Sequence, residues 1–481
     1  MKKAIYWFRQ DLRLSDNPAL SAAASDSEVL PIYILDDVNA GEYSMGAASR
    51  SWLHHSLIAL NKQLKGKLKV YKGDPANILL EIAKNYSVDS IYWNRCYEPW
   101  QISRDKNIKK LFEEHNIAVN SYNGSLLWEP WEVLKQDQTP YKVFTPYYRK
   151  GCLGGRAPRE PIAAPSKLLF ADAIPNSDSL NIKDIEDLKL LPEKTWHHKI
   201  INSWDIGEEA AHQRLDDFLA QGISDYKEGR NFPYKANVSR LSPHLHFGEI
   251  SPHFIWHKMQ FKNDSSYSSD IDHFCSELGW REFSYYLLYH FPNLPKQNLN
   301  NKFDSFPWAQ DLKLLSCWQR GQTGIPIVDA GMRELWQTGY MHNRVRMIVG
   351  SFLVKNLLLH WHHGERWFWD CLIDADLASN NASWQWVAGC GTDAAPYFRI
   401  FNPVTQGQKF DAAGLYTRKF VPELQLMPEQ YLFNPWEAPA NILHSAGVEL
   451  GSNYPKPIVD LKESRNRALE AFASLKHQEY E

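Results

Sequence analysis

The hydrophobic positions of this chain follow two different periods in its two halves. Over residues 1–125, short runs of β-branched and aromatic residues alternate with amphipathic stretches of helical spacing. The runs predict strands, which we expect at 4–8, 29–35, 68–71, 90–93 and 118–122. Helices are expected between them, at 47–64, 75–86 and 102–115. This alternation predicts an α/β, Rossmann-like domain built on a parallel sheet.

The second half is predicted to be helical. Periodicity is lost from about residue 131 to 205, where Pro and Gly recur, and a stretch of that length indicates a connector between domains. Beyond residue 206 we expect helices at 208–222, 271–289, 327–337, 342–360 and 367–372. The predicted organisation is therefore an α/β domain at 1–130, an interdomain connector at 131–205 and an all-α domain at 206–475.

Composition narrows the class of protein. With 481 residues, 44% hydrophobic and 23% charged, the chain is typical of a soluble protein of two or three domains. The net charge of -3 gives no global sign of a polyanion partner but leaves room for a local basic face. The six cysteines have no close spacing and the histidine pairs lack established ligand spacing, so we expect no disulfide and no metal site. No stretch approaches a membrane span or a signal peptide, so the expected compartment is the cytoplasm.

The most informative segment is 374–386, with the sequence DADLASNNASWQW. If it is helical, Asp376, Asn380 and Trp384 recur at every fourth position and share one face. A carboxylate, an amide and an oxidisable ring in a row need polar partners when they are buried. A bound aromatic cofactor with its own donors and acceptors would supply those partners.

Together with four other segments, this one closely resembles the photolyase and cryptochrome family. The other segments are 7–17 (WFRQDLRLSDN), 226–248 with YKEGR and SRLSPHLHFG, 277–283 (ELGWREF) and 342–347 (HNRVRM). The resemblance covers about residues 3–470 and is strongest to the class III branch, which is related to class I. It implies an antenna domain at 1–130 and a FAD- and DNA-binding domain at 206–475. It also implies that Arg9 and Asp11 lock the two domains, whereas an ion pair at the strand end is the simpler interpretation.

The resemblance assigns a set of residues to FAD. It places the run 239–242 at the pyrophosphate, whereas capping preference alone favours N-capping of a helix by Ser242 or Ser239. Arg346 and Asp374 match a pair at the isoalloxazine ring. Asn380 matches the position facing flavin N5, where an amide that does not titrate favours an anionic flavin. The residues expected to bind FAD are Tyr226, Val238, Ser239, Arg240, Leu241, Ser242, Phe274, Glu277, Arg281, Asn343, Arg346, Asp374, Ala375, Asp376 and Asn380.

A second set is assigned to the DNA lesion. In family members that repair cyclobutane pyrimidine dimers, the residue matching Glu277 hydrogen-bonds the flipped-out dimer and the one matching Trp280 stacks on it. Spacing alone would make Glu277 and Arg281 a surface ion pair. Asn343 and Met347 stand where (6-4) photolyases carry His, which argues against that activity. The expected catalytic residues are Glu277, Trp280, Asn343, Met347 and Asn380, and the expected DNA-binding residues are Glu277, Trp280, Arg281, Asn343, Arg344 and Gln406.

Three of the 19 tryptophans have a second expected role. Trp308, Trp361 and Trp384 match the tryptophan series through which the family transfers electrons between flavin and surface. Without the resemblance, packing in an aromatic-rich core is the better interpretation.

The resemblance thus implies a deoxyribodipyrimidine photo-lyase, which would repair cyclobutane pyrimidine dimers in DNA by electron transfer from excited reduced FAD. The resemblance implies 5,10-methenyltetrahydrofolate as antenna, but Trp100-Gln101 stands where the class I type has its folate-binding Asn-Glu pair. An 8-hydroxy-deazaflavin, or no antenna, remains an alternative. We expect a monomer that acts on damaged DNA and not on membranes. The alternatives are a cryptochrome-like blue-light photoreceptor without repair activity and a nucleotide-binding α/β protein whose tryptophans are only core.

Overall fold

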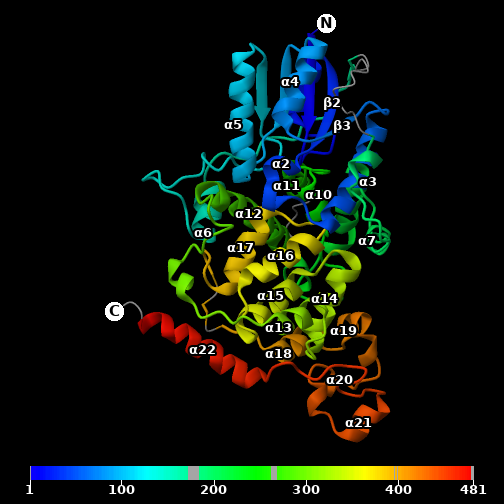
Figure 1. Cartoon of the computed structure of the whole chain (residues 1–481), viewed down its shortest axis with the longest axis vertical. Coiled ribbons are helices and arrows are strands. Elements are labelled where there is room, and N and C mark those ends of the chain that lie inside the picture. Colours follow the sequence, from blue (N-terminus) through cyan, green and yellow to red (C-terminus); the bar gives the residue numbers. More distant parts are fainter. Residues whose placement is uncertain (1, 172–183, 262–267, 395, 398, 478–481) are drawn as a thin grey trace. The chain divides into compact units, whose positions relative to one another are not determined.

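The computed structural model describes residues 2–171, 184–261, 268–394, 396–397 and 399–477. The chain forms two compact units, each made of several sequence segments (Figure 1). Unit 1 comprises residues 1–223, 239–292 and 373–378, and unit 2 comprises residues 224–238, 293–372 and 379–481. The domain boundaries at 130 and 205 stay a prediction, and residues 172–183 of the predicted connector lie outside the described residues.

Unit 1 contains the predicted parallel sheet. Its strands are β1 (Lys2–Phe8), β2 (Ser27–Leu35), β3 (Lys69–Lys72), β4 (Ser90–Asn94) and β5 (Ala118–Tyr122). All neighbours are parallel, in the order β3-β2-β1-β4-β5 (Figure 1). The expected strands and the α/β fold class are confirmed, because β-branched and aromatic runs that are buried on both faces favour parallel pairing.

Helices pack on both faces of this sheet. Leu79 and Ile82 of α4 (Pro75–Tyr86) and Ile108 and Phe112 of α5 (Pro99–Glu114) share a buried cluster with side chains of β1, β2 and β4. On the opposite face lies α1 (Pro18–Asp26), which the sequence interpretation did not include. The other helices of unit 1 are α2 (Asp37–Ala40), α3 (Ala47–Gln63), α6 (Phe144–Pro146), α7 (His197–Ile201), α8 (Glu208–Asp217), α10 (Ser242–His246), α11 (Pro252–Phe261) and α12 (Ser268–His290).

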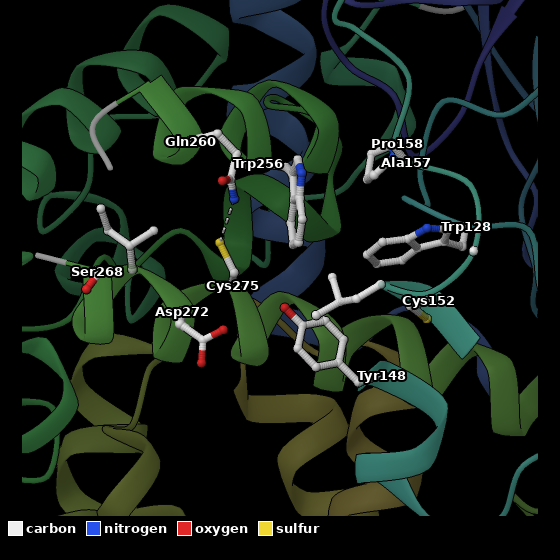
Figure 2. Close-up of a pocket in the computed structure, with 13 residues that line it drawn as sticks. Trp128, Tyr148, Cys152, Ala157, Pro158, Trp256, Gln260, Ser268, Asp272 and Cys275 are labelled. Atoms are coloured by element: carbon white, nitrogen blue, oxygen red, sulfur yellow. Dashed lines mark hydrogen bonds between the residues drawn. The ribbon is translucent and has the colours of Figure 1, made fainter. Parts of the chain in front are cut away.

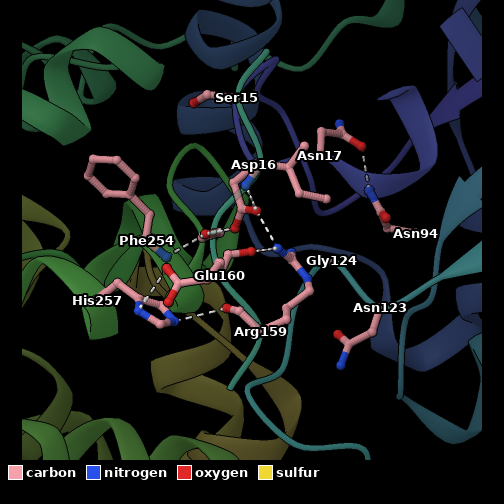
Figure 3. A network of polar contacts seen from close by, with 12 residues as sticks. Ser15, Asp16, Asn17, Asn94, Asn123, Gly124, Arg159, Glu160, Phe254 and His257 are labelled. Atoms are coloured by element: carbon pink, nitrogen blue, oxygen red, sulfur yellow. Dashed lines mark hydrogen bonds and ion pairs between the residues drawn. The ribbon is translucent and has the colours of Figure 1, made fainter. Parts of the chain in front are cut away.

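The turn after β1 holds several segments of unit 1 together (Figure 3). Asp16 accepts hydrogen bonds from Arg159 (2.5 Å), from the Ile162 amide (2.9 Å) and from Ser251. Burial acts to raise the pKa of Asp16, but its bond from Arg159 and the charges of Arg13 and Arg159 outweigh burial and lower it. This carboxylate therefore ties β1 to the connector and to the segment before α11.

The side chains of Arg9 and Asp11 do not join the two predicted domains. The Arg9 guanidinium pairs with Asp105 at 2.5 Å, and Asp11 accepts from the Tyr6 hydroxyl at 2.5 Å, so both side chains bond partners within residues 1–130. Hydrogen bonds to residues beyond 206 come from the residues that follow: the Leu12 amide donates to the Phe247 carbonyl at 3.0 Å, and Arg13 donates to the Gly248 carbonyl at 2.9 Å. The expected interdomain role of the two side chains is therefore wrong, although the Asp11 backbone packs closely against Gly248.

Unit 2 is helical. Its helices are α9 (Tyr226–Gly229), α13 (Leu312–Gln319), α14 (Pro326–Thr338), α15 (Asn343–Ser351), α16 (Trp361–Cys371), α18 (Pro403–Phe410), α19 (Leu415–Phe420), α20 (Glu429–Leu432), α21 (Ala440–Ser445) and α22 (Leu461–His477). The helix α17 (Leu377–Ala388) begins in the last residues assigned to unit 1 and continues in unit 2. Within the described part of the chain, no helix is both long and apolar enough to span a membrane.

Three predicted helices differ from the structure. The stretch 208–222 is α8 followed by a π-helical turn at Phe218–Gly222. The stretch 342–360 is α15 followed by a π-helical turn at Phe352–Asn356, because Leu358 adopts a left-handed backbone with φ of 55° that ends the helix. The predicted helix at 367–372 is the last part of the longer α16. In the segment 374–386 the helix begins at Leu377, so Asn380 and Trp384 share a helical face while Asp376 precedes it.

Candidate functional site

In unit 1, the run 239–242 is held by Asp374. Ser242 is exposed, and its hydroxyl donates to Oδ2 of the buried Asp374 at 2.6 Å. The N-cap of α10 is Leu241, with no side-chain capping bond, so simple N-capping by Ser242 or Ser239 is wrong. Arg240 has a left-handed backbone with φ of 53°, and its guanidinium lies 4.2 Å from the ring centre of Trp204.

Asp376 and its neighbour Ala375 are buried in the same unit. The Asp376 carboxylate accepts a hydrogen bond from the hydroxyl of Tyr285 on α12 and lies 3.8 Å from Nδ1 of His246. Burial, and then the charge of Asp376, raise the pKa of Glu98 to about 7. The sequence interpretation missed Tyr285, His246 and Glu98, because they belong to three separate segments that only the fold brings to Asp376.

The helix α12 carries four of the predicted site residues. Phe274 is buried, whereas Glu277 is partly exposed and lies 3.9 Å from His273. Arg281 donates to Glu282 at 3.0 Å and to the Ser125 carbonyl at 2.9 Å, and its guanidinium lies 5.1 Å from the ring centre of Tyr285. The described partners of Arg281 therefore anchor it to the segment that follows β5, while Glu277 lies on the preceding turn of the helix.

Trp280 lies between Glu277 and Arg281 in sequence and is partly exposed. Its ring stacks on Phe144 of α6, with ring centres 3.8 Å apart and planes 11° from parallel. One face of the indole is thus covered by protein, so its exposure belongs to the other face and the edges.

In unit 2, the helix α15 carries the predicted site residues Asn343, Arg346 and Met347. Its N-cap is His342, whose Nδ1 accepts from the Arg344 amide at 3.2 Å. Asn343 is exposed and Met347 partly exposed, one helical turn apart. Arg346 donates to the Met341 carbonyl at 2.7 Å. Burial and the charges of Arg230, Arg344 and Arg346 lower the pKa of His342 to about 3, which identifies a concentration of positive charge at the start of α15.

Four other predicted residues of unit 2 are Arg344, also on α15, and Gln406, Tyr226 and Val238 on other segments. Arg344 donates to Asn231, and its guanidinium lies 4.3 Å from the ring centre of Phe410 on α18. Gln406 lies on the same helix, one turn before Phe410, and its buried Oε1 has no partner among the described residues. Tyr226 is buried with the Arg230 guanidinium 5.5 Å from its ring centre, and Val238 is partly buried.

Asn380 and Trp384 are fixed by α16. Asn380 donates to the Glu365 carbonyl at 3.0 Å, so its side-chain amide is oriented and its oxygen is left as an acceptor. Trp384 lies directly against Gly364: a Cβ there would be 2.1 Å from its Cη2. Both side chains are at least nine-tenths buried, with 8% and 3% exposure.

Trp361 and Trp308 are the other two members of the predicted tryptophan series that includes Trp384. Trp361 is the first residue of α16, one turn before Gly364, and donates to Asn298 at 3.0 Å. The His360 ring bridges it to Trp308, with ring centres 5.6 Å from Trp361 and 5.1 Å from Trp308. Trp384 and Trp361 are buried while Trp308 is partly exposed, so the series runs from the interior of unit 2 toward its surface.

The residue types in both units fit FAD. The Ser239 hydroxyl and the Arg240 guanidinium are donors of the kind that phosphate oxygens accept. The Ser242 hydroxyl gives its one hydrogen to Asp374, which leaves its oxygen as an acceptor. The buried Asp374 and Asp376 carboxylates are acceptors of the kind that ribityl hydroxyls and a ring N–H require.

Unit 1 also contains a cavity of about 430 Å³ that the sequence did not reveal (Figure 2). Its walls include Trp128 just before the connector, Tyr148 in the connector and Trp256 on α11. Near its rim the Gln260 amide points to the Cys275 thiol. A cavity of this size with aromatic walls can hold a planar ligand.

Comparison with known proteins identifies two family domains. Residues 4–166 match the profile described as "DNA photolyase", and residues 274–474 match "FAD binding domain of DNA photolyase". The chain is 47% identical to "Deoxyribodipyrimidine photo-lyase" of Agrobacterium fabrum, with 98% of each chain covered. It is 37% identical to "Cryptochrome-2" of Arabidopsis thaliana, over 98% of this chain and 79% of that protein. The solved class III photolyase of Agrobacterium tumefaciens superposes with a TM-score of 0.94 at 46% identity, over 99% of this chain and 98% of that one.

Proposed function

The chain belongs to the photolyase and cryptochrome family, and we propose that it repairs cyclobutane pyrimidine dimers in DNA under blue light. Reduced FAD, when bound and excited by light, would lend the dimer an electron that splits the cyclobutane ring, and the electron would return to the flavin, so that no net oxidation or reduction occurs. The protein's residues bind, orient and exclude water around the reacting groups. Identity of 47% over 98% of the chain to a deoxyribodipyrimidine photo-lyase supports this activity over the lower-identity cryptochromes.

We assign FAD binding to the predicted residues of both units. Ser239 and Arg240 bind phosphate oxygens, and Ser242, whose hydroxyl hydrogen is used by Asp374, contributes its backbone N–H. Arg346 stabilises negative charge on the ring. Asn380 offers its amide oxygen toward the ring, because its NH₂ group is used by Glu365.

The observation that carries the proposal is the Glu277–Trp280 turn of α12. It presents a carboxylate and an indole ring, both partly exposed, and Phe144 covers one face of the indole. A flipped-out dimer needs an acceptor for its base N–H groups and a flat apolar wall, and these two side chains provide them. We further assign Asn343 and Met347 to the dimer and Arg344 and Gln406 to the damaged strand.

The experiment uses irradiated oligothymidine and the protein with reduced FAD. Dimers are expected to disappear under blue light with the wild-type protein and to persist with Glu277→Ala/Trp280→Ala, which should also bind the damaged strand more weakly. An inactive wild-type protein that retains FAD would overturn the repair proposal and favour the photoreceptor. A double variant that equals wild type would overturn the roles of these two residues.

We propose that Trp384, Trp361 and Trp308 conduct electrons between the surface and the buried end of the series. Indole is readily oxidised, and the measured ring contacts through His360 join Trp361 to Trp308. Trp384→Phe should slow light-driven reduction of oxidised bound FAD by an order of magnitude or more, while protein reduced chemically beforehand still repairs dimers. Unchanged photoreduction would remove Trp384 from this role.

The antenna is proposed to be 5,10-methenyltetrahydrofolate, with an 8-hydroxy-deazaflavin or no antenna as alternatives. The aromatic cavity lined by Trp128, Tyr148 and Trp256 suits a planar chromophore in size and lining. Chromophores extracted from protein purified from its native source should include the folate, and Trp256→Ala should reduce its retention. Extraction of FAD alone would contradict this assignment.

We further propose that the protein acts on DNA as a monomer in the cytoplasm. Light scattering of the purified protein should give the mass of one chain, 55.7 kDa. The mass of two chains would contradict the proposed monomer. Recovery of the protein in the membrane fraction of cells would contradict the proposed cytoplasmic location.

A further inference from the structure

Three rings of unit 1 form a continuous stack that begins at Trp280. Trp280 and Phe144 have ring centres 3.8 Å apart and planes within 11°. Phe144 in turn lies 5.4 Å from Tyr148 with planes within 9°. Tyr148 is also a wall of the aromatic cavity. We call Trp280, Phe144 and Tyr148 the aromatic column.

The column depends on close approach between the connector and α12. Tyr148 lies so near Gly279 that a Cβ there would be 2.6 Å from its Cδ2. The connector supplies Phe144 from α6 and Tyr148 from the π-helical turn Tyr147–Cys152, an element in which side chains are displaced from α-helical spacing. The Phe144 side chain is 6% exposed and the Tyr148 side chain is 1% exposed, so packing against other side chains holds both rings in place.

We propose that Phe144 is a positioning residue for dimer recognition: it fixes the plane of Trp280 and thereby sets the affinity for damaged over undamaged DNA. This inference rests on the proposed function, because it assigns Trp280 to the lesion. Parallel contact at 3.8 Å prevents the indole from rotating about its Cβ–Cγ bond and closes that face to water and bases. An ordered ring then loses little rotational freedom when a dimer stacks on its other face, which improves affinity without a new contact.

The test compares Phe144→Leu, which keeps apolar volume but has no flat face, with Phe144→Tyr, which keeps the ring. For the FAD-containing protein, Phe144→Leu should weaken binding to a dimer-bearing oligonucleotide about 3- to 10-fold, the range expected for one lost aromatic pair. Binding to the same strand without a dimer and the repair rate at saturating substrate should stay unchanged. Phe144→Tyr should retain wild-type discrimination.

Tyr147→Leu is the matched control. Tyr147 is the neighbouring buried ring of the same connector, but it packs on Phe283 and Tyr286 with ring centres 5.0 and 4.6 Å away. It should lower thermal stability and leave discrimination between the two strands unchanged. Equal loss of discrimination in Tyr147→Leu and Phe144→Leu would show general loosening of the connector and overturn the proposal.

A double-mutant cycle separates positioning from packing. In a Trp280→Ala background, Phe144→Leu should cause no further loss of dimer affinity, because the ring that it positions is absent. An additive loss would overturn the proposal. If the wild-type protein binds damaged and undamaged strands equally, the proposed function is overturned. If the wild-type protein prefers damaged strands and Phe144→Leu has the same preference, only the inference about Phe144 is overturned.

Discussion

Ser242 donates its hydroxyl to Asp374 at 2.6 Å, although 132 positions separate the two residues in sequence. One residue begins the short helix α10 and the other lies just before α17. The bond links the run assigned to phosphate with the acidic segment assigned to the flavin ring, so each of these segments depends on the other for its position.

Removing this bond should weaken FAD retention. Ser242→Ala loses a hydrogen bond to a charged group, worth about 1 kcal/mol at an exposed position, so FAD affinity should fall about fivefold. Titration of the apoprotein with FAD, followed by flavin fluorescence, measures the change. Ser203→Ala is the control, because the exposed Ser203 hydroxyl donates to the nearby Lys199 carbonyl at 2.9 Å. Equal FAD affinity in Ser242→Ala and wild type would contradict the expectation.

Gly364 should be required for the position of Trp384. A Cβ at Gly364 would lie 2.1 Å from the indole, so Gly364→Ala should displace the ring, lower stability by about 1–3 kcal/mol and slow light-driven flavin reduction. Gly350→Ala offers a matched control on the same tryptophan, because its Cβ would lie 3.6 Å from the ring, an ordinary contact. Denaturant unfolding and flavin photoreduction measure both effects. Equal stability and equal photoreduction rates in Gly364→Ala and Gly350→Ala would contradict the steric argument.

Glu98 should make stability depend on pH. Burial and the Asp376 charge raise its pKa from 4.5 to about 7, so its contribution is complete below pH 4.5 and is lost as pH rises through about 7. The loss should be of the order of 2–3 kcal/mol. Glu98→Gln should therefore unfold at a less pH-dependent temperature than wild type across this window.

Other titrating groups are common to both proteins in that comparison. His246 and Asp376 face Glu98, and burial also raises the pKa of Glu282 to about 7. Their contributions largely cancel in the difference between wild type and Glu98→Gln. A difference that stays constant from acid to neutral pH would contradict the burial argument.

Arg344 should contribute to DNA affinity in a salt-dependent way. It lies in the cluster of positive charge at the start of α15, where burial and Arg230 lower its pKa. Arg344→Ala should weaken binding to damaged and undamaged strands alike and reduce the slope of log affinity against log salt by about 1. Lys462→Ala, on exposed α22, is the control for a general change in charge. A loss confined to damaged strands would assign Arg344 to the lesion instead of the phosphates.

The sequence by itself determined the parallel sheet, the helical second half and the family. Strands buried on both faces read as uninterrupted apolar runs, and those local patterns need no tertiary information. The family motifs likewise are contiguous, so the Glu277–Trp280 turn and the segment 374–386 could be found without a structure.

Only the tertiary structure decided which side chains meet. The Ser242–Asp374 bond, the Tyr285 hydroxyl on Asp376 and the Phe144 ring on Trp280 join segments at least 91 residues apart. No periodicity encodes such pairs, because they arise from packing between elements. The predicted helix ends before Leu358, and Arg13 rather than Arg9 bonds Gly248. Both differences from the prediction arise because long-range packing and hydrogen bonding outweigh local preference.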